Sequence, residues 1–161
     1  MSTETRVGYE RQEYLDQGYP KFPVKYQGET FTCFVLPQSI CPKLPHFVRH
    51  QVADDRTQIR TPDETSVFGV SDSIPIDFRQ FVVIHEIVEY WIGKSCGQST
   101  RREIEVMRAS GLTLVEQSQY IAMRCEFFEG FIGFAKKYGY PPIKIAEFKT
   151  SLEIFKNTSS I

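Results

Sequence analysis

The segment Phe78–Ile92 constrains the fold more than any other part of this chain, because the helix that it predicts is apolar on nearly every side. Beyond its first turn, the residues that are neither apolar nor aromatic are His85, Glu86 and Glu89. A helix of this composition is normally buried all round, and burying an uncompensated charge costs several kcal/mol. The three ionisable side chains must therefore pair, join a hydrogen-bond network, hold a metal ion or line a cleft.

The spacing of these residues favours a shared metal site. His85 and Glu89 stand in an i, i+4 relation, so they lie on one face of a helix and can converge on one ion. Glu86 lies about 100° further round the helix, where its carboxylate reaches a bound water more readily than the ion. We therefore expect two metal ligands and one acid–base group on the same helix.

The run His85–Glu86–Ile87–Val88–Glu89 resembles the H-E-x-x-H helix of the zincin metallopeptidases, with Glu89 in place of the second histidine. It is also similar to a group of zincin-like proteins that carry H-E-(L/I)-V-E on a hydrophobic helix. The resemblance implies that His85 and Glu89 are zinc ligands and that Glu86 is the general base acting on metal-bound water. A carboxylate makes the site harder, so iron or manganese, or a site that has lost catalysis, are alternatives.

A third ligand has to come from a later part of the chain, and Glu126 and Glu129 are the candidates in that order. Both lie in a long predicted helix, where Glu126, Gly130 and Gly133 share a face. Glycine lowers helix stability, so close packing against another helix, a substrate or the His85 helix would explain the two glycines. A carboxylate from a downstream helix is also what the resemblance to gluzincin-type metallopeptidases implies.

Two other groups of residues are alternative sources of ligands. Cys41, His46 and His50 form a Cys-x4-His-x3-His pattern. The two histidines are one turn apart if a helix begins at Pro45, but no C-x-x-C pair completes a structural zinc site. One of these histidines could instead join the His85 site as an added ligand.

Glu103 and Glu105 are further carboxylates that a later helix offers. Their neighbours Arg101, Arg102 and Arg108 predict that both glutamates lie on a solvated face, where they would not serve as ligands.

Without a metal, the same helix predicts a buried polar network. His85 would then bond to Glu89 or to a backbone carbonyl. Glu86 would pair with an arginine such as Arg79 or Arg124. This is a second hypothesis, a non-catalytic binding or interaction module that retains a zincin-like scaffold. A third is a helical carboxylate site for iron, which needs a second metal-binding helix and would use the two downstream glutamates.

The fold class that the chain predicts is α+β, with a small antiparallel sheet in the N-terminal half followed by about four helices, in a zincin-like arrangement. Residues that favour strands fill Phe22–Tyr26 and Thr30–Leu36 on either side of Gln27–Gly28–Glu29, which predicts a hairpin. Val67–Val70 predicts one more short strand.

Helix boundaries follow from capping residues, glycines and prolines. Asp77 is the expected N-cap of the apolar helix, and capping-box patterns begin at Thr100 and Thr113. The expected helices are Glu10–Asp16, a short one from Pro45, Asp77–Ile92, one from Thr100 that ends at Gly111, one from Thr113 to Tyr138, and Pro142–Lys156.

Length and composition limit the classes of protein that remain. A chain of 161 residues fits a single domain over 1–161, rich in strands and loops in 1–74 and helical in 75–161. Its 19 basic and 20 acidic residues exclude a general electrostatic binder of nucleic acid. The chain has no apolar run of about 18 residues that could cross a membrane, and Met1–Arg11 lacks the apolar stretch of a secretory signal. Cysteines without a C-x-x-C pair fit a reducing cytoplasm.

Together these features predict a small metal-dependent hydrolase of the peptidase type, with zinc as the expected ion. In the mechanism that the resemblance implies, the metal lowers the pKa of its water, Glu86 takes the proton, and hydroxide attacks a carbonyl. The substrate would be a peptide or protein, and neither nucleic acid nor a membrane is expected as a partner. A second copy of the chain or a partner protein could complete the cleft.

Overall fold

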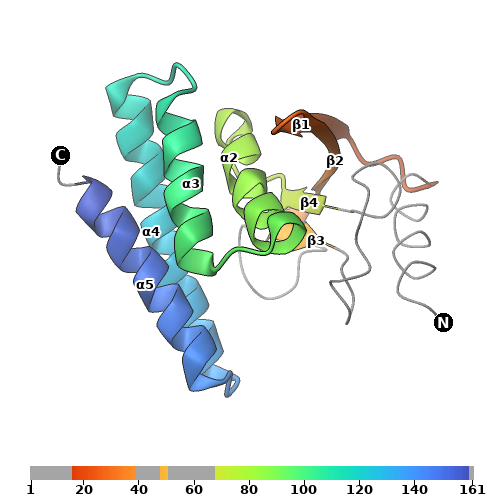
Figure 1. Cartoon of the computed structure of the whole chain (residues 1–161). Helices are drawn as coiled ribbons and strands as arrows, with labels where there is room; N and C mark the ends of the chain where they lie inside the picture. The colour runs from red at the N-terminus through yellow and green to blue at the C-terminus, as the bar shows by residue number, and fades with distance from the viewer. Residues whose placement is uncertain (1–15, 39–47, 51–67, 160–161) are drawn as a thin grey trace. The chain divides into compact units, whose positions relative to one another are not determined.

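The computed structural model describes residues 16–38, 48–50 and 68–159 (Figure 1). Strands in the first part of the chain are followed by helices, which confirms the α+β class. The chain forms two compact units, Met1–Ile92 and Gly93–Ile161, called unit 1 and unit 2 below. The boundary between the two units lies after residue 74, where the sequence changes from a strand- and loop-rich part to a helical part. The reason is that the first helix after residue 74 belongs to unit 1. The single domain over 1–161 stays a prediction.

The sheet of unit 1 begins with the predicted hairpin, β1 (Lys21–Tyr26) paired antiparallel to β2 (Glu29–Leu36). Gln27 and Gly28 connect them with φ values of 50° and 81°. Two successive residues with positive φ are typical of the type I′ turn that joins two-residue hairpins. The hairpin prediction is therefore confirmed.

The rest of the sheet differs from the wholly antiparallel one that the sequence predicts. The strand order is β1-β2-β4-β3, with β3 at Val48–His50 and β4 at Phe68–Ser71. β4 pairs parallel to β2 and antiparallel to β3. Parallel neighbours need a long crossover connection, and the chain between β2 and β4 provides it, so the sheet is mixed. The short strand predicted near residue 67 is confirmed as β4.

The helix that follows the sheet is α2 (Ile76–Glu86), which continues without a break as the π-helix η3 (Ile87–Ile92). The predicted helical span is confirmed, but Pro75 stands at the N-cap position and Asp77 lies in the first turn. α2 packs against β1, β3 and β4. The core of unit 1 combines strand and helix side chains, including Phe31, Phe34, Leu36, Val70, Ile74, Phe81, Val83 and Ile87.

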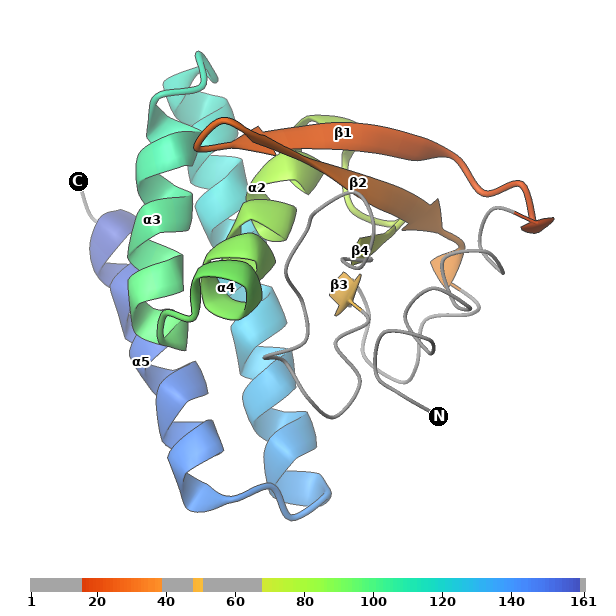
Figure 2. The ribbon, with the colours of Figure 1, turned by 45° about the vertical axis from the view of Figure 1, so that its right-hand side comes forward.

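Unit 2 consists of three helices: α3 (Cys96–Arg108), α4 (Leu114–Lys137) and α5 (Pro142–Ser159). α5 packs against both of the others (Figure 2). The start of α3 at Thr100 was predicted wrongly, because Ser95 caps this helix and closes a capping box with Gln98. The start of α4 is confirmed: Glu116 N–H donates to Thr113 Oγ1 at 3.1 Å, and Thr113 N–H donates to Glu116 Oε1 at 2.9 Å.

The two glycines of α4 do not mark a close helix contact within unit 2. Gly130 and Gly133 are exposed, and a Cβ added at either would meet no atom within 4 Å among the described residues. The prediction that a packed neighbour explains them is therefore not supported by the described structure.

Two predicted helices fall largely on residues outside the described ranges. The one over Glu10–Asp16 lies there except for its last residue, and so does the proposed start at Pro45. His50 belongs to β3, so a helix that carries it one turn after His46 is wrong. Among the described residues, none of the helices is both long enough and apolar enough to cross a lipid bilayer.

Candidate functional site

The predicted pairing of His85 with Glu89 is confirmed in unit 1. His85 is 2% exposed and lies at the end of α2, and Glu89 lies one turn later in η3. The imidazole Nε2 is 3.0 Å from Glu89 Oε2, and the side chains are 3% and 14% exposed. A buried imidazole thus meets a carboxylate that solvent can still reach.

The change from α-helix to π-helix falls inside this pair. The backbone runs as an α-helix to Glu86 and as a π-helix over Ile87–Ile92. π-Helical turns are rare and occur frequently at functional sites. The segment is crowded with β-branched and aromatic residues, which are weak α-helix formers, but this composition does not by itself predict a π-helix. Gly93 with φ 89° follows its end.

Trp91 lies in the same π-helix and is half-buried. Its ring packs edge-to-face against Phe31 of β2, with centroids 5.7 Å apart. Because Phe31 is fully buried, this contact ties the turn that carries Glu89 to the sheet.

Glu86 lies beside the pair and is half-buried. The network hypothesis gave it Arg79 or Arg124 as partner, and this pairing stays a prediction. Arg79 Nε donates to Ile74 O at 2.7 Å and its Nη2 donates to Asp72 O at 3.0 Å. The role of Glu86 as general base stays a prediction.

The candidates for a third ligand do not join this pair within unit 1. Glu126 and Glu129 both belong to α4 in unit 2, where they are exposed. Cys41 and His46 lie outside the described residues, and of His50 the structure gives the strand position alone. Each of these residues stays a prediction as a ligand.

A second buried ionic cluster, in unit 2, was missed by the sequence analysis. Arg124 donates to Glu103 through Nε at 2.7 Å and through Nη2 at 3.1 Å, and Tyr120 OH donates to the same carboxylate. Glu103 is 0% exposed and Arg124 is 3% exposed. The prediction of a solvated face is therefore wrong for Glu103, whereas Glu105 is indeed exposed.

The surroundings of this cluster are aromatic and dry. The Arg124 guanidinium carbon lies 5.1 Å from the ring centroid of Phe128 and 5.5 Å from that of Phe155, distances at which a cation is attracted to the ring face. Burial raises the pKa of Tyr120 well above its ordinary value, and the negative charge of Glu103 raises it further. The phenol therefore stays protonated and keeps donating to the carboxylate.

A signal for this cluster is present in the sequence. Cys96, Ser99, Thr100, Glu103, Ile104 and Met107 are the buried residues of α3. Their helical spacing places Glu103 on the buried stripe, whereas Arg101 and Arg108 are exposed.

Among the described cysteines, Cys33 and Cys96 are buried and Cys125 is half-buried. Cys96 Sγ lies 3.1 Å from Ser151 Oγ in the interior of unit 2, and Thr100 Oγ1 donates to the same hydroxyl at 2.8 Å. Burial raises the pKa of the Cys33 thiol well above its ordinary range. Burial, and secondarily the Glu129 carboxylate, also raise the pKa of Cys125. Neither thiol therefore favours the thiolate form that nucleophilic catalysis needs.

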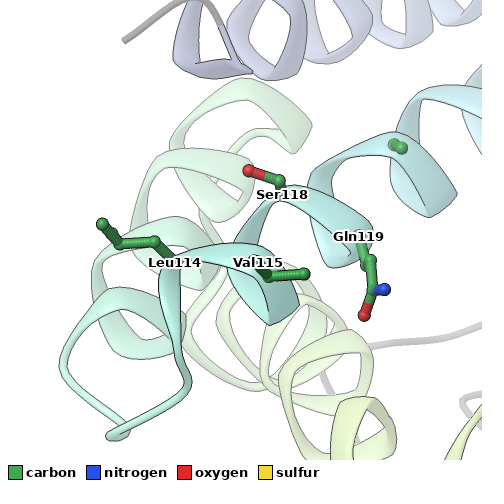
Figure 3. A pocket seen from close by; sticks show the side chains of 5 residues that line it. Leu114, Val115, Ser118 and Gln119 are labelled. Atoms are coloured by element: carbon green, nitrogen blue, oxygen red, sulfur yellow. The ribbon is translucent and has the colours of Figure 1, made fainter.

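A shallow groove lies on the first turns of α4, the helix that also carries Tyr120 and Arg124. Leu114, Val115, Ser118, Gln119 and Ala122 line it (Figure 3). None of these side chains is ionisable, so the groove cannot supply acid–base chemistry.

Comparisons of the chain with protein family models, with curated proteins and with solved structures give no match. The resemblance to the zincins therefore rests on the sequence run His85–Glu89 alone.

Proposed function

We propose that the protein is a metal-binding hydrolase of the zincin type, with His85 and Glu89 as ligands and Glu86 as the general base. The observation that carries this proposal is the contact of the His85 imidazole with the Glu89 carboxylate, 3.0 Å apart at the change to a π-helix. The partial exposure of Glu89, 14% for its side chain, supports it further, because an ion needs a path from solvent.

The donor pair fits zinc by chemistry and by separation. Imidazole nitrogen and carboxylate oxygen are both common zinc ligands, and two ligands at about 2.1 Å in a tetrahedral site lie roughly 3.4 Å from each other. The observed separation of 3.0 Å needs an adjustment of a few tenths of an ångström. Iron or manganese would suit the carboxylate as well.

Each side chain would have a distinct part in the reaction. A bound ion would supply Lewis acidity and a lower pKa for a water at the site. His85 and Glu89 would hold the ion, with His85 fixed by its burial. The Glu86 carboxylate would accept a proton from water and return it to the leaving group of a peptide substrate. One of Glu126 and Glu129 remains proposed as the third ligand.

The test is the metal content of the protein purified without added metal, measured by mass spectrometry. We expect near-stoichiometric zinc in the wild type and its loss in His85→Ala and in Glu89→Gln. Loss of a direct ligand should weaken binding by more than the roughly 10–100-fold typical of outer-shell partners. Glu153→Gln is the matched control, because Glu153 is an exposed glutamate of α5 outside the proposed site, and it should keep the metal.

Two further results decide the finer assignments. Glu126→Gln and Glu129→Gln, measured in the same way, should separate the third ligand from a bystander. Glu86→Gln should keep the metal and lose hydrolysis of a denatured protein substrate. Wild-type protein that contains no metal and takes up none on titration with zinc, iron or manganese would overturn the metal proposal.

A second candidate function, the non-catalytic module with a buried His/Glu network, is favoured by the same contact. At 3.0 Å the His85 Nε2–H can donate directly to Glu89, which satisfies a buried imidazole without any ion. Under this reading Glu89→Gln, whose amide oxygen still accepts the bond, leaves stability nearly unchanged, and no variant changes the metal content.

We place the hydrolase in the cytoplasm in this proposal. Cys33, Cys96 and Cys125 are free thiols, and thiols of this kind persist in a reducing compartment.

A further inference from the structure

The turn between α4 and α5 projects beyond α3. α3 has 13 residues and α4 has 24, so α3 runs beside the first half of α4 alone. A Cβ at Gly97, in the first turn of α3, would lie 3.3 Å from Thr150 Cγ2 of α5, and the part of α5 before this contact extends further. Figures 1 and 2 show the α4–α5 turn past the start of α3.

This projecting tip exposes large apolar side chains. Tyr138 is 46% exposed, Tyr140 is 39% and Ile143 is 74%. Pro141 and Pro142 between them are exposed as well. Together these five residues form the surface that we call the apolar tip.

The tyrosines of the apolar tip are held in place. Phe134 packs against Tyr138 with centroids 4.5 Å apart and against Tyr140 with centroids 5.9 Å apart. The backbone turn is fixed by Gly139 with φ 69° and by the hydrogen bond from Tyr140 N–H to Ala135 O at 2.9 Å, the pattern of a Schellman cap. Binding through these rings would therefore lose little conformational entropy.

The charge of the chain around the tip is positive on balance. Between Glu129 and Glu147 the chain carries no acidic residue and three lysines, Lys136, Lys137 and Lys144. Lys144 is partly engaged by Glu147 at 3.4 Å, whereas Lys136 and Lys137 are exposed. The net charge of −1 for the whole chain conceals this local positive end.

We propose that the apolar tip docks on the surface of an anionic lipid membrane. Tyrosine rings and an aliphatic side chain flanked by lysines match the boundary between acyl chains and negative headgroups, and a projecting helical turn can meet a flat surface. The expectation that no membrane is a partner rested on the lack of a spanning helix, which surface docking does not require.

Single-stranded nucleic acid is the competing partner, because it also takes lysines and aromatic rings. The observations favour lipid for two reasons. Ile143, which is more exposed than either tyrosine of the tip, offers no ring on which a base could stack. The ring of Tyr138 is already covered in part, by Phe134 and by Lys137, whose Nζ lies 5.5 Å from its centroid.

The test is co-sedimentation of the full chain with phosphatidylcholine vesicles, with and without about one third phosphatidylserine. We expect binding to the anionic vesicles alone, and a decrease as salt shortens the Debye length from about 30 Å at 0.01 M to about 3 Å at 1 M. The double variant Lys136→Glu/Lys137→Glu should weaken partitioning at least about tenfold, and Ile143→Ser about threefold or more.

Matched controls lie outside the tip on the same two helices. Lys149→Glu changes an exposed lysine of α5, and Leu114→Ser changes a residue of α4 that is 80% exposed. Both should bind like the wild type. Absence of wild-type binding, equal binding to neutral vesicles, or tip variants that bind as well as the controls would overturn the proposal. So would tip-dependent binding of an oligo(dT) strand without vesicle binding. The metal content of the protein plays no part in these outcomes.

Discussion

Replacing Glu103 by glutamine should destabilise unit 2 far more than the same replacement at Glu105, two positions away on α3. Glu103 is 0% exposed and pairs with Arg124, whose side chain is 3% exposed. Glu105 pairs with Arg102 at 2.9 Å, and these side chains are 64% and 42% exposed. The two glutamates therefore form the same kind of ion pair, one in the dry interior and one in water.

The magnitude follows from what the substitution leaves behind. Removing one partner of a buried ion pair costs about 3–5 kcal/mol, because the other charge remains buried without compensation. The glutamine amide also turns a donor toward Arg124 or Tyr120, both of which donate to Glu103. The aromatic rings around Arg124 would offset about 1 kcal/mol, so we expect a loss of about 3 kcal/mol. Glu105→Gln should cost under about 0.5 kcal/mol.

Urea unfolding followed by far-UV circular dichroism at neutral pH measures both values. With a slope near 2 kcal/mol/M, a loss of about 3 kcal/mol lowers the midpoint by roughly 1.5 M. The double variant Glu103→Met/Arg124→Met should recover most of this loss, because apolar replacements of buried pairs are often neutral or stabilising. Equal midpoints for the Glu103→Gln and Glu105→Gln variants would refute the assignment of a buried ion pair.

Three further predictions concern unit 2. Thr113→Ala removes the capping box of α4 and should lower the free energy of unfolding by about 1 kcal/mol, whereas Ser118→Ala on the exposed surface should not lower it. Gly133→Ala, with open space around its Cβ, should raise the free energy of unfolding by about 0.8–1 kcal/mol. Gly139→Ala, at φ 69°, should lower the free energy of unfolding by about 1 kcal/mol. The raised pKa of Tyr120 stabilises the fold below the unfolded value of about 10, so stability should fall as the pH rises above about 10, by up to about 1.4 kcal/mol per pH unit. Urea midpoints between about pH 9 and 11 measure this decline, which Tyr120→Phe should make shallower; an unchanged slope in that variant would exclude Tyr120 as its source.

Local signals in the sequence predicted the element boundaries where one residue type fixes the backbone. Gly28 in the hairpin turn and Thr113 at the start of α4 are such positions. The capping box at Thr100 failed because the same pattern also occurs at Ser95. A cap requires an extended backbone at its first residue, and Ser95 has ψ 162° while Thr100 lies inside the helix. The spacing of the residue types alone does not predict which of the two positions has the extended backbone.

Contacts between residues that are far apart in the sequence were not predicted. His85 and Glu89 are one turn apart, so helix geometry alone brings them together. Glu103 and Arg124 are separated by 21 positions, and their pairing depends on how α3, α4 and α5 pack. The parallel pairing of β2 with β4 is likewise a contact between distant parts of the chain, which short-range sequence patterns do not predict.

The two buried acid-containing pairs also show why His85–Glu89 is the better candidate for a metal centre. In the Glu103 cluster, a permanently charged guanidinium binds both carboxylate oxygens, and a cation beside them repels a divalent ion. Histidine can instead give up its Nε2 proton to a metal, because its neutral form is a ligand. Solvent reaches the carboxylate of Glu89, at 14% exposure, but not that of Glu103. Burial and charge therefore favour a stabilising part for the Glu103–Arg124 pair, and they leave the His85–Glu89 pair as the one that we propose as the metal site.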